Sequence, residues 1–372
     1  MAIERLAWCK ISKKAIEHNI GQIQKFVGKD VGIMAVVKGN AYGHGAIEVS
    51  KIALESGVKC LGVSSFYEAK RLRESGIKDQ IVILGFTPTE NYYDMVENDI
   101  TVTIRSLDVA HSLVTAARRL NKIARVWIKV NTGLNRLGLK PGEVLFFAKK
   151  LQDLPNLEVE GIFTHFAGDD EDTEATFTKQ QLHVFNKVLD ELKKEKIEIS
   201  IKSAANTAAI FSVPESHFDM VRAGIGLWGF DTSGLGKVRL EKALTFKTEI
   251  VQITEIQVGE TVGYSRTFKA TRPTTVATIA VGYADGFRRA PKNWGEVLIA
   301  GQKAPLVGRV SMDQAAVDIT DLEGDIRRGV EVILVGKSRD LELSADDVAE
   351  KLGTSPYEVL TSISARVSRF YV

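Results

Sequence analysis

The chain contains the segment Val31-Gly-Ile-Met-Ala-Val-Val-Lys38-Gly-Asn-Ala-Tyr42-Gly-His-Gly45, which ends an apolar run on a lysine. The run is rich in valine and isoleucine, and such a run is typical of a strand buried on both faces of a parallel sheet. Glycines and an asparagine then predict a turn, and a helical pattern begins at Ala46. Lys38 is therefore expected at the carboxyl end of a buried strand, where α/β folds place their chemistry.

A lysine at the dry end of a strand loses solvation, which disfavours its charged form. Lys38 is therefore a candidate amine nucleophile that could form a Schiff base. The alternative is a strand-end lysine whose amine reaches water, as most such lysines do. The glycines around it favour the first interpretation, because glycine lets a bulky ligand approach the backbone closely.

Strand and helix patterns alternate regularly beyond this segment. An amphipathic helix is expected over 11–27, with Ser12 near its start. Strands are predicted near 31–38, 60–64, 81–84, 100–104, 124–130, 158–164, 199–204 and 218–222. Helices are predicted over 46–56, 67–75, 89–98, 106–120, 141–151, 173–195, 206–212 and from about 225. This pattern predicts an α/β fold, a (β/α)8 TIM-like barrel; an open doubly wound sheet is the alternative, but no G-x-G-x-x-G follows the first strand.

The pattern changes near residue 240 to short alternating strands separated by glycines, which predicts a β-rich C-terminal domain. We expect a barrel domain over 1–240, whose first ten or so residues could pair with the second domain, and that second domain over 241–372. Its strands are predicted at 245–256, 275–281, 296–299, 304–310, 315–319 and 330–335, with one helix at 343–352.

Composition excludes several classes of protein. The net charge of +2 is spread along the chain, and no basic stripe suggests nucleic acid. No apolar stretch is long enough to cross a bilayer, and no signal peptide is seen at the start. The two cysteines give neither a disulfide framework nor zinc spacing, so we expect reduced thiols, a cytoplasmic location and no metal.

Polar residues follow several predicted barrel strands, as expected for a barrel enzyme. Arg136 could clamp a carboxylate, although a surface arginine is the commoner case, and the buried Lys129 needs a partner if it stays charged. His165 alone would more often be a hydrogen-bonded core residue. Asn206 or Thr207 could cap a short helix and leave N–H groups for an anion, and glycines after the eighth strand could bind a phosphate.

The segment Ala35-Val-Val-Lys38-Gly-Asn-Ala-Tyr42-Gly-His-Gly45 resembles the pyridoxal-phosphate signature of the alanine racemases, in which the lysine carries the cofactor. Further blocks resemble that family across nearly the whole chain. They are Lys129-Val-Asn131-Thr-Gly-Leu-Asn-Arg136-Leu-Gly138, Ser203-Ala-Ala-Asn206-Thr207, Val221-Arg222-Ala-Gly224-Ile225-Gly226, Thr261-Val-Gly-Tyr264-Ser-Arg, Gly282-Tyr283-Ala-Asp285-Gly286 and Gly308-Arg309-Val-Ser311-Met312-Asp313-Gln314.

For the barrel, the resemblance implies that Arg136 orients the substrate carboxylate and that Lys129 could be carbamylated, as in some members. Asn131 stands where the family usually has an aspartate. His165 would line the cofactor ring, and Arg222 would face the pyridine nitrogen. The phosphate would be held by Tyr42, Asn206, Thr207, Gly224 and Ile225.

For the second domain, the resemblance implies that Tyr264 is a catalytic base opposite Lys38, contributed by the partner subunit of a homodimer. Met312 and Asp313 would bind the substrate, with the Met312 main chain at the carboxylate, while Tyr283 and Arg309 would line the access channel. Ala365 replaces a pocket tyrosine, so the substrate could be serine or lysine, or the specificity broad, instead of alanine. With alanine as substrate, the product would serve peptidoglycan synthesis.

Two other classes stay open at this point. A pyridoxal-phosphate decarboxylase shares the barrel and β-domain plan, but we would expect a carboxylate in place of Arg222 and a cysteine in the second domain. A non-catalytic pyridoxal-phosphate-binding protein would need only the barrel, and the second domain with Tyr264 argues against it.

Overall fold

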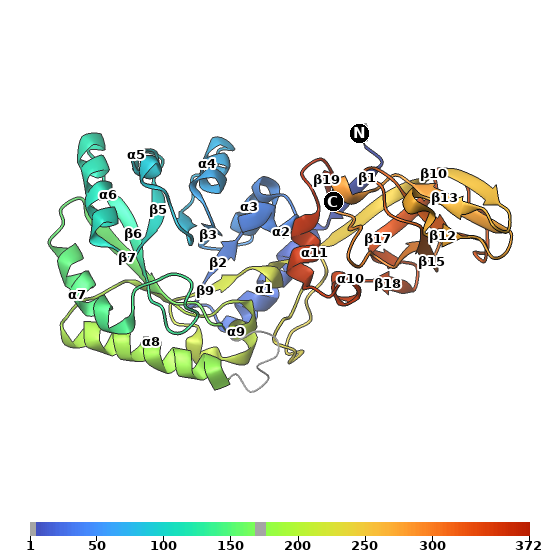
Figure 1. Cartoon of the computed structure of the whole chain (residues 1–372). Coiled ribbons are helices and arrows are strands. Elements are labelled where there is room, and N and C mark those ends of the chain that lie inside the picture. Colours follow the sequence, from blue (N-terminus) through green and yellow to red (C-terminus); the bar gives the residue numbers. More distant parts are fainter. Residues whose placement is uncertain (1–4, 168–175) are drawn as a thin grey trace. The chain divides into compact units, whose positions relative to one another are not determined.

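The computed structural model describes residues 5–167 and 176–372, which form two compact units (Figure 1). The barrel unit comprises Lys14–Ala41 and Ala46–Glu241. Of the described residues, the strand-rich unit comprises Arg5–Lys13, the short segment Tyr42–Gly45, and Lys242–Val372. Each unit is described by itself below.

Eight parallel strands build the barrel, as the strand–helix alternation predicts. They pair in the order β8-β7-β6-β5-β4-β3-β2-β9. Asp219 N donates to Lys202 O at 3.2 Å, and Arg222 N donates to Ala205 O at 3.0 Å, so β8 and β9 close the ring. The strands are β2 (Gly32–Val36), β3 (Cys60–Val63), β4 (Ile81–Ile83), β5 (Ile100–Ile104), β6 (Ala124–Lys129), β7 (Leu157–Phe163), β8 (Ile201–Ser203) and β9 (Met220–Ala223).

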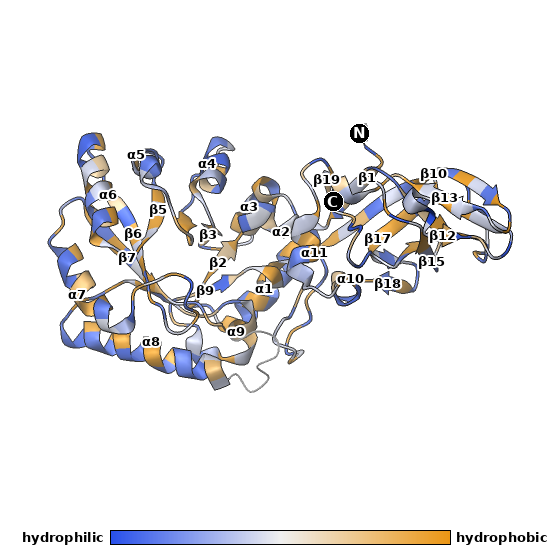
Figure 2. Cartoon of the chain, in the orientation of Figure 1, coloured by the Kyte–Doolittle hydropathy of each residue, from blue (hydrophilic) through white to orange (hydrophobic). Residues whose placement is uncertain are grey.

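Helices with one apolar face surround these strands. In α8 the buried residues include Leu182, Phe185 and Val188, at helical spacing, and Figure 2 shows blue and orange alternating along this helix. The helices are α1 (Lys13–Val27), α3 (Ala46–Glu55), α4 (Phe66–Glu74), α5 (Tyr92–Glu97), α6 (Leu107–Leu120), α7 (Pro141–Gln152), α8 (Thr176–Lys194) and α9 (Thr207–Ser212).

Two helix predictions need correction. The helix expected from Ile11 begins at Lys13, because Ile11 is a buried residue of strand β1 (Ala7–Ile11). The helix expected from about residue 225 is only a single turn, Ile225–Trp228, which ends at Gly229 in the left-handed region with φ 97°. The first residues of the helix predicted over 173–195 lie outside the described residues.

The strand-rich unit is built on a nine-stranded sheet with the order β18-β17-β14-β15-β16-β13-β10-β1-β19, and β17 also pairs with β10. β1 runs antiparallel to β10 (Leu244–Ile256) and parallel to β19 (Ser368–Tyr371). The other strands are β13 (Thr274–Ile279), β14 (Glu296–Ile299), β15 (Gln302–Val307), β16 (Ala315–Asp318), β17 (Glu331–Ser338) and β18 (Leu341–Leu343).

The sequence patterns miss the shortest elements of this unit. The pair β11 (Thr261–Val262) and β12 (Phe268–Lys269) is too short for an alternation to be visible. β18, β19 and helix α11 (Pro356–Ser362) were likewise not predicted, whereas helix α10 (Ala345–Leu352) was. The signal for α11 is Pro356 directly after Ser355, a common helix start.

The chain after β2 makes a short turn, α2 (Lys38–Tyr42), with a left-handed backbone conformation. Gly39, Asn40, Ala41 and Tyr42 all have φ between 52° and 61°, the left-handed region that L-residues rarely adopt in succession. A Cβ on Gly43 would lie 2.2 Å from the carbonyl oxygen of Leu360, so this position requires glycine. The segment after the lysine is therefore held in a costly backbone conformation.

Candidate active site

Lys38 follows β2 at the carboxyl end of the barrel and is half-buried. Burial lowers the pKa of its amine, the positive charges of Arg136 and Arg222 lower it further, and the carboxylate of Glu68 opposes these effects. The neutral amine, which is the nucleophilic form, is therefore favoured relative to a lysine in water.

Glu68, at the start of α4, fixes the turn that carries Lys38. One of its carboxylate oxygens accepts a hydrogen bond from Gly39 N at 2.7 Å. The other accepts from the backbone N and the hydroxyl of Ser64, at 2.8 and 2.7 Å. Sequence reasoning missed Glu68, because a glutamate in the first turn of a helix is unremarkable until the fold brings it beside Gly39.

Lys129 ends β6 with only 4% of the residue exposed. Its amine lies 5.1 Å from the centre of the Phe163 ring. Burial lowers the pKa of Lys129 to about 7, with the charges of Arg222, Arg136 and Lys38 adding to the effect. Near neutral pH a large share of this lysine is therefore uncharged.

The loop after β6 is closed by two backbone hydrogen bonds, Leu139 N to Lys129 O at 2.9 Å and Asn131 N to Leu139 O at 2.8 Å. Asn131 Oδ1 accepts from the backbone N atoms of Asn135, at 2.9 Å, and Gly133, at 3.2 Å. An aspartate would accept the same two bonds. Asparagine thus keeps the loop geometry while it leaves out a negative charge, and Arg136 is exposed on this loop.

Arg222 in β9 is buried, and its guanidinium is held by oxygen acceptors. It donates to Ser203 Oγ at 2.8 Å, Thr164 O at 2.7 Å and Ala204 O at 3.1 Å. Burial lowers its pKa to about 9, which is still above neutrality, so the side chain stays charged.

His165, after β7, contacts Arg222. Arg222 Nη2 donates to His165 Nδ1 at 3.1 Å. Because Nδ1 accepts this bond, the imidazole is neutral and carries its proton on Nε2. Burial, followed by the charge of Arg222, holds the pKa of His165 well below its usual value and keeps the ring in this neutral form.

The start of α9 is tied to the loop after β9. Asn206 is the N-cap, and its Oδ1 accepts from Ala209 N at 3.0 Å. The Thr207 hydroxyl accepts from Gly224 N at 3.1 Å and from Gly226 N at 3.4 Å. A Cβ on Gly226 would lie 2.9 Å from Thr207 Cγ2, so glycine permits this close approach.

The barrel unit therefore gathers Lys38, Lys129, Arg136 and Arg222 close enough to influence one another's charge. Among the described residues, none of these four cations forms an ion pair with a carboxylate. A cluster of this kind is completed by an anion. An amine nucleophile among such cations fits pyridoxal phosphate, which offers an aldehyde carbon to the amine and a phosphate to the cations.

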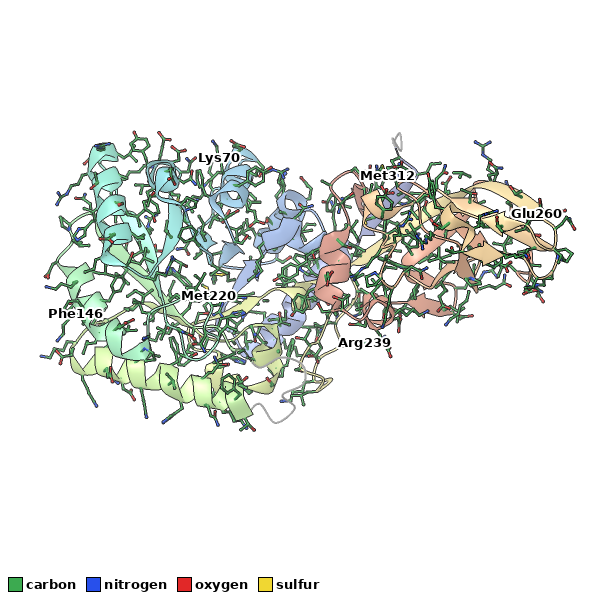
Figure 3. The ribbon with its side chains drawn as sticks, in the orientation of Figure 1. Lys70, Phe146, Met220, Arg239, Glu260 and Met312 are labelled. Carbon is green, nitrogen blue, oxygen red and sulfur yellow. The ribbon has the colours of Figure 1, made fainter. Side chains whose placement is uncertain are left out.

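The remaining predicted residues belong to the strand-rich unit. Tyr264, Tyr283 and Met312 are 65%, 42% and 53% exposed, and Figure 3 labels Met312. The Arg289 guanidinium lies 5.8 Å from the centre of the Tyr264 ring. The Tyr42 ring lies 5.9 Å from that of Tyr357. Ala365 is exposed in the turn before β19, and Arg309 is exposed beside Gly308.

These features define a barrel enzyme in which a lysine nucleophile lies in a site built for an anion. Comparison with known proteins agrees. The model of the alanine racemase N-terminal domain matches residues 11–232, and that of the alanine racemase C-terminal domain matches residues 243–371. The chain belongs to the alanine racemase family.

Curated relatives and solved structures extend over the full length. The chain is 40% identical to the alanine racemase of Methanococcus maripaludis over 369 residues, 98% of each chain. It is similar to the alanine racemase structure of Clostridium difficile, with a TM-score of 0.95, 36% identity and coverage of 100% of this chain and 97% of that one. It is also similar to the alanine racemase of Bartonella henselae with covalently bound pyridoxal phosphate, with a TM-score of 0.88, 31% identity and coverage of 99% of each chain.

Two further findings concern the described part of the chain. No helix there is both long and apolar enough to span a membrane. No group of three or more histidine, cysteine, aspartate or glutamate side chains there is arranged to hold a metal ion. Cys9 and Cys60 are buried free thiols, and burial raises the pKa of both.

Proposed function

We propose that this enzyme interconverts L- and D-alanine with two bases, Lys38 and Tyr264, and that Tyr264 is contributed by the partner subunit of a homodimer. Membership in the alanine racemase family supplies the reaction and the dependence on pyridoxal phosphate. The observation in this chain that carries the proposal is the Lys38 amine, whose charged form is disfavoured among cations that form no ion pair within residues 5–167 and 176–372.

Pyridoxal phosphate, when bound, withdraws electrons from the amino acid and so makes its Cα proton acidic. Lys38 would hold it covalently, and Tyr42, Asn206, Thr207, Gly224 and Ile225 would hold its phosphate. His165 would lie against the ring, with Arg222 facing the pyridine nitrogen. Because Arg222 stays charged, it would leave that nitrogen largely unprotonated and limit electron withdrawal, which suits racemisation over transamination.

The substrate carboxylate would be bound by Arg136 and by the main chain of Met312. The Asp313 carboxylate accepts a hydrogen bond from Arg366 at 2.8 Å. We therefore assign Asp313 to the support of Met312 and not to a direct bond with another carboxylate. Tyr283 and Arg309 would line the access channel.

Racemisation needs one proton removed from one face of Cα and another delivered to the opposite face. Tyr264 would take the proton of L-alanine, and Lys38 would deliver a proton on the other side; the roles reverse for D-alanine. The exposure of Tyr264 within its own unit, 65%, is what a side chain acting in a partner's site would show.

Lys129 would react with carbon dioxide to form a carbamate. Only the neutral amine reacts in this way, and a pKa of about 7 provides it. The resulting anion would lie near Arg136 and Arg222, whose charges it would balance. Binding of isotopically labelled bicarbonate to the wild type, but not to Lys129→Met, tests this assignment.

The two-base proposal is tested by incubating the cofactor-loaded protein with L-alanine in deuterated water. Chiral analysis and Cα deuterium incorporation are followed together. We expect Lys38→Ala to lose both activity and the visible absorbance of the bound cofactor. Tyr264→Phe should keep that absorbance and lose racemisation by at least about a hundredfold.

Tyr67→Phe is the matched control, because Tyr67 is an exposed tyrosine on the outer helix α4. It should racemise at the wild-type rate. Full activity of Tyr264→Phe would defeat the two-base assignment. Carbon dioxide released from the amino acid in place of D-product would point to the decarboxylase alternative, and neither product would point to the non-catalytic one.

A second candidate is racemisation of a larger amino acid, because position 365 carries only a methyl group. Ala365 is exposed in its turn, so a tyrosine could be introduced there without disturbing a packed core. We expect Ala365→Tyr to lower turnover of serine or lysine relative to alanine, and Ala365→Ser to leave the ratio near wild type. An unchanged ratio in Ala365→Tyr would remove this candidate.

A further inference from the structure

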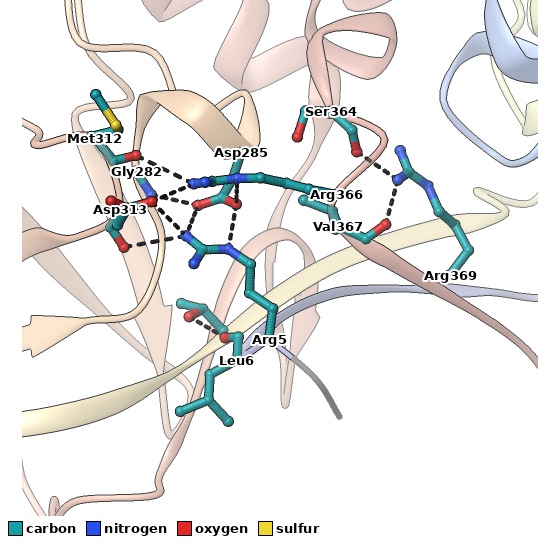
Figure 4. Close-up of polar contacts among 11 residues, drawn as sticks. Arg5, Leu6, Gly282, Asp285, Met312, Asp313, Ser364, Arg366, Val367 and Arg369 are labelled. Carbon is teal, nitrogen blue, oxygen red and sulfur yellow. Dashed lines mark hydrogen bonds and ion pairs between the residues drawn. The ribbon is translucent and has the colours of Figure 1, made fainter. Parts of the chain in front are cut away.

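We propose that Asp285, together with Arg5 and Arg366, is a positioning residue that fixes the main chain at Met312 for binding the substrate carboxylate. The inference rests on the proposed function, since that function gives Met312 its role. The three residues come from distant parts of the sequence and meet within the strand-rich unit (Figure 4).

The Asp285 carboxylate is fully buried and accepts hydrogen bonds from three directions. Arg5 binds both of its oxygens, through Nε at 2.6 Å and Nη2 at 2.5 Å. Arg366 Nε donates at 2.8 Å, and Gly282 N donates at 2.9 Å. Although burial alone would raise the pKa of Asp285, the bonds from Arg5, Arg366 and Gly282 hold it below its usual value.

The same two arginines continue to the loop at 312–313. Arg366 Nη2 donates to Asp313 Oδ1 at 2.8 Å and reaches Met312 O at 3.5 Å. Arg5 Nη2 donates to Asp313 O at 3.4 Å and lies 3.6 Å from Asp313 Oδ1. Two guanidinium groups and two carboxylates thus balance in charge and connect a buried anchor, Asp285, to an exposed loop.

Backbone contacts complete the connection. Tyr283 N donates to Ser311 O at 3.0 Å, and Ala284 N donates to Met312 O at 3.1 Å. A Cβ on Gly282 would lie 2.3 Å from Met312 O, so only glycine allows these two segments to approach. Because Ser311 C=O and Met312 N–H share one peptide plane, the bond from Tyr283 also sets the direction of the Met312 N–H.

We expect the network of Arg5, Asp285 and Arg366 to fix the geometry of the loop at 312–313 as well as to stabilise the fold. A buried ion-pair network is often no more stable than apolar packing, but it fixes one geometry. Here the network ends on Met312 and Asp313. Their side chains are about half exposed, so burial in a core does not hold them in place. A loop that must present its main chain to a ligand needs such external support.

The test uses the cofactor-loaded wild type and the variants Asp285→Asn, Arg366→Gln and Arg366→Lys. We expect KM for both alanine enantiomers to rise about tenfold in Asp285→Asn and Arg366→Gln, with kcat within about twofold of wild type. Arg366→Lys should rescue only in part, because an ammonium cannot reproduce the forked contacts of arginine.

Propionate provides a binding probe that is independent of turnover, since it has the carboxylate and methyl group of alanine without the amine. Its Kd, measured by calorimetry, should rise in parallel with KM. Asp321→Asn is the control, because Arg272 and Asp321 form a similar two-pronged pair at an exposed position of the same unit. The control should leave both quantities unchanged.

KM and propionate Kd within twofold of wild type in both Asp285→Asn and Arg366→Gln would overturn the inference, even if the melting temperature fell. If Asp285→Asn does not fold, Arg366→Gln decides alone, since it leaves the bond pair between Arg5 and Asp285 intact. A wild-type enzyme that binds propionate but does not racemise alanine would defeat the proposed function and leave the positioning role testable by Kd.

Discussion

One cluster of positive charges helps to lower the pKa of two lysines, Lys38 and Lys129. Both lose solvation, and each lies near the other and near Arg136 and Arg222. The two differ in surroundings, because Glu68 offsets part of the lowering of the Lys38 pKa, whereas among the described residues no carboxylate offsets that of Lys129. The sequence predicts that Lys129 is buried and needs a partner for its charge, but it does not show that Arg222 and Lys38 lie close enough to help lower the pKa to about 7.

The positive charge of Lys129 should lower the free energy of unfolding of the cofactor-free protein. In the unfolded chain this lysine has its ordinary pKa of 10.5, against about 7 when folded, so the unfolded state binds more protons between these values. The resulting destabilisation is complete below about pH 7 and is relieved as the pH rises toward 10.5. We expect Lys129→Met to raise the free energy of unfolding by roughly 2–5 kcal/mol near pH 6.

The increase in the free energy of unfolding of Lys129→Met should shrink by about half between pH 6 and pH 9, as measured by urea titrations in carbonate-free buffer. Lys187→Met is the control, because Lys187 is exposed on α8, and it should show no such trend. A gain in Lys129→Met that stays constant over this pH range would contradict the assignment.

At the scale of single elements, β7 depends on a glycine. A Cβ on Gly161 would lie 2.5 Å from the Trp127 ring atoms Cδ2 and Cε2, and Trp127 is fully buried in β6. We therefore expect Gly161→Ala to lower the free energy of unfolding by roughly 1–3 kcal/mol, as overpacking of a core does. The measurement is the urea midpoint of the purified protein.

Gly142→Ala provides the matched control. Gly142 lies in the first turn of α7, and a Cβ there would meet nothing within 4 Å. Alanine favours helix, so this variant should be neutral or slightly more stable, by up to about 1 kcal/mol. Equal destabilisation by both substitutions would mean that the Trp127 contact is not the cause.

The elements with strong periodicity could be predicted from the sequence, and the barrel strands lie where their apolar runs are. Elements without a hydrophobic periodicity could not be predicted in this way. Ile225–Trp228 has the apolar composition of a helix, but Gly224 and Gly229 leave room for only one turn. β19 has no alternation in burial, since all four residues are half-buried, and it is defined only by its partner β1.

The same contrast holds for the site. Lys38, Arg136 and His165 follow barrel strands, while Lys129 and Arg222 lie near the carboxyl ends of β6 and β9, so sequence order alone brings all five to one end of the barrel. Glu68, Arg5 and Asp285 act through contacts between segments far apart in sequence. No motif contains Glu68 or Arg5, and the block that contains Asp285 does not show its partners, because the tertiary fold brings them together.

At the scale of the whole molecule, the proposed homodimer can be tested by mixing two inactive variants. If Tyr264 serves the partner's site, a heterodimer of Lys38→Ala and Tyr264→Ala has one site with both bases. After unfolding and refolding an equal mixture, half of the dimers should be heterodimers, and activity should return to about a quarter of the wild-type value.

Each variant refolded alone is the control and should stay inactive. Activity that remains absent in the mixture, while native mass spectrometry shows mixed dimers, would place Tyr264 in the site of its own chain. A mixture of Lys38→Ala with Lys129→Met gives a further comparison. Both substitutions lie in the barrel unit, so no site of a mixed dimer contains both Lys38 and Lys129.

The interleaving of the two units has a consequence for how the protein is made. Strand β1 and the segment Tyr42–Gly45 leave the ribosome early, yet their partners come much later, as in the bond from Arg369 Nε to Gly43 O, which spans 326 residues. At about 5–20 residues per second, such a wait lasts roughly 15–65 seconds. Until these partners are made, β1 is an unpaired edge that could pair with another chain.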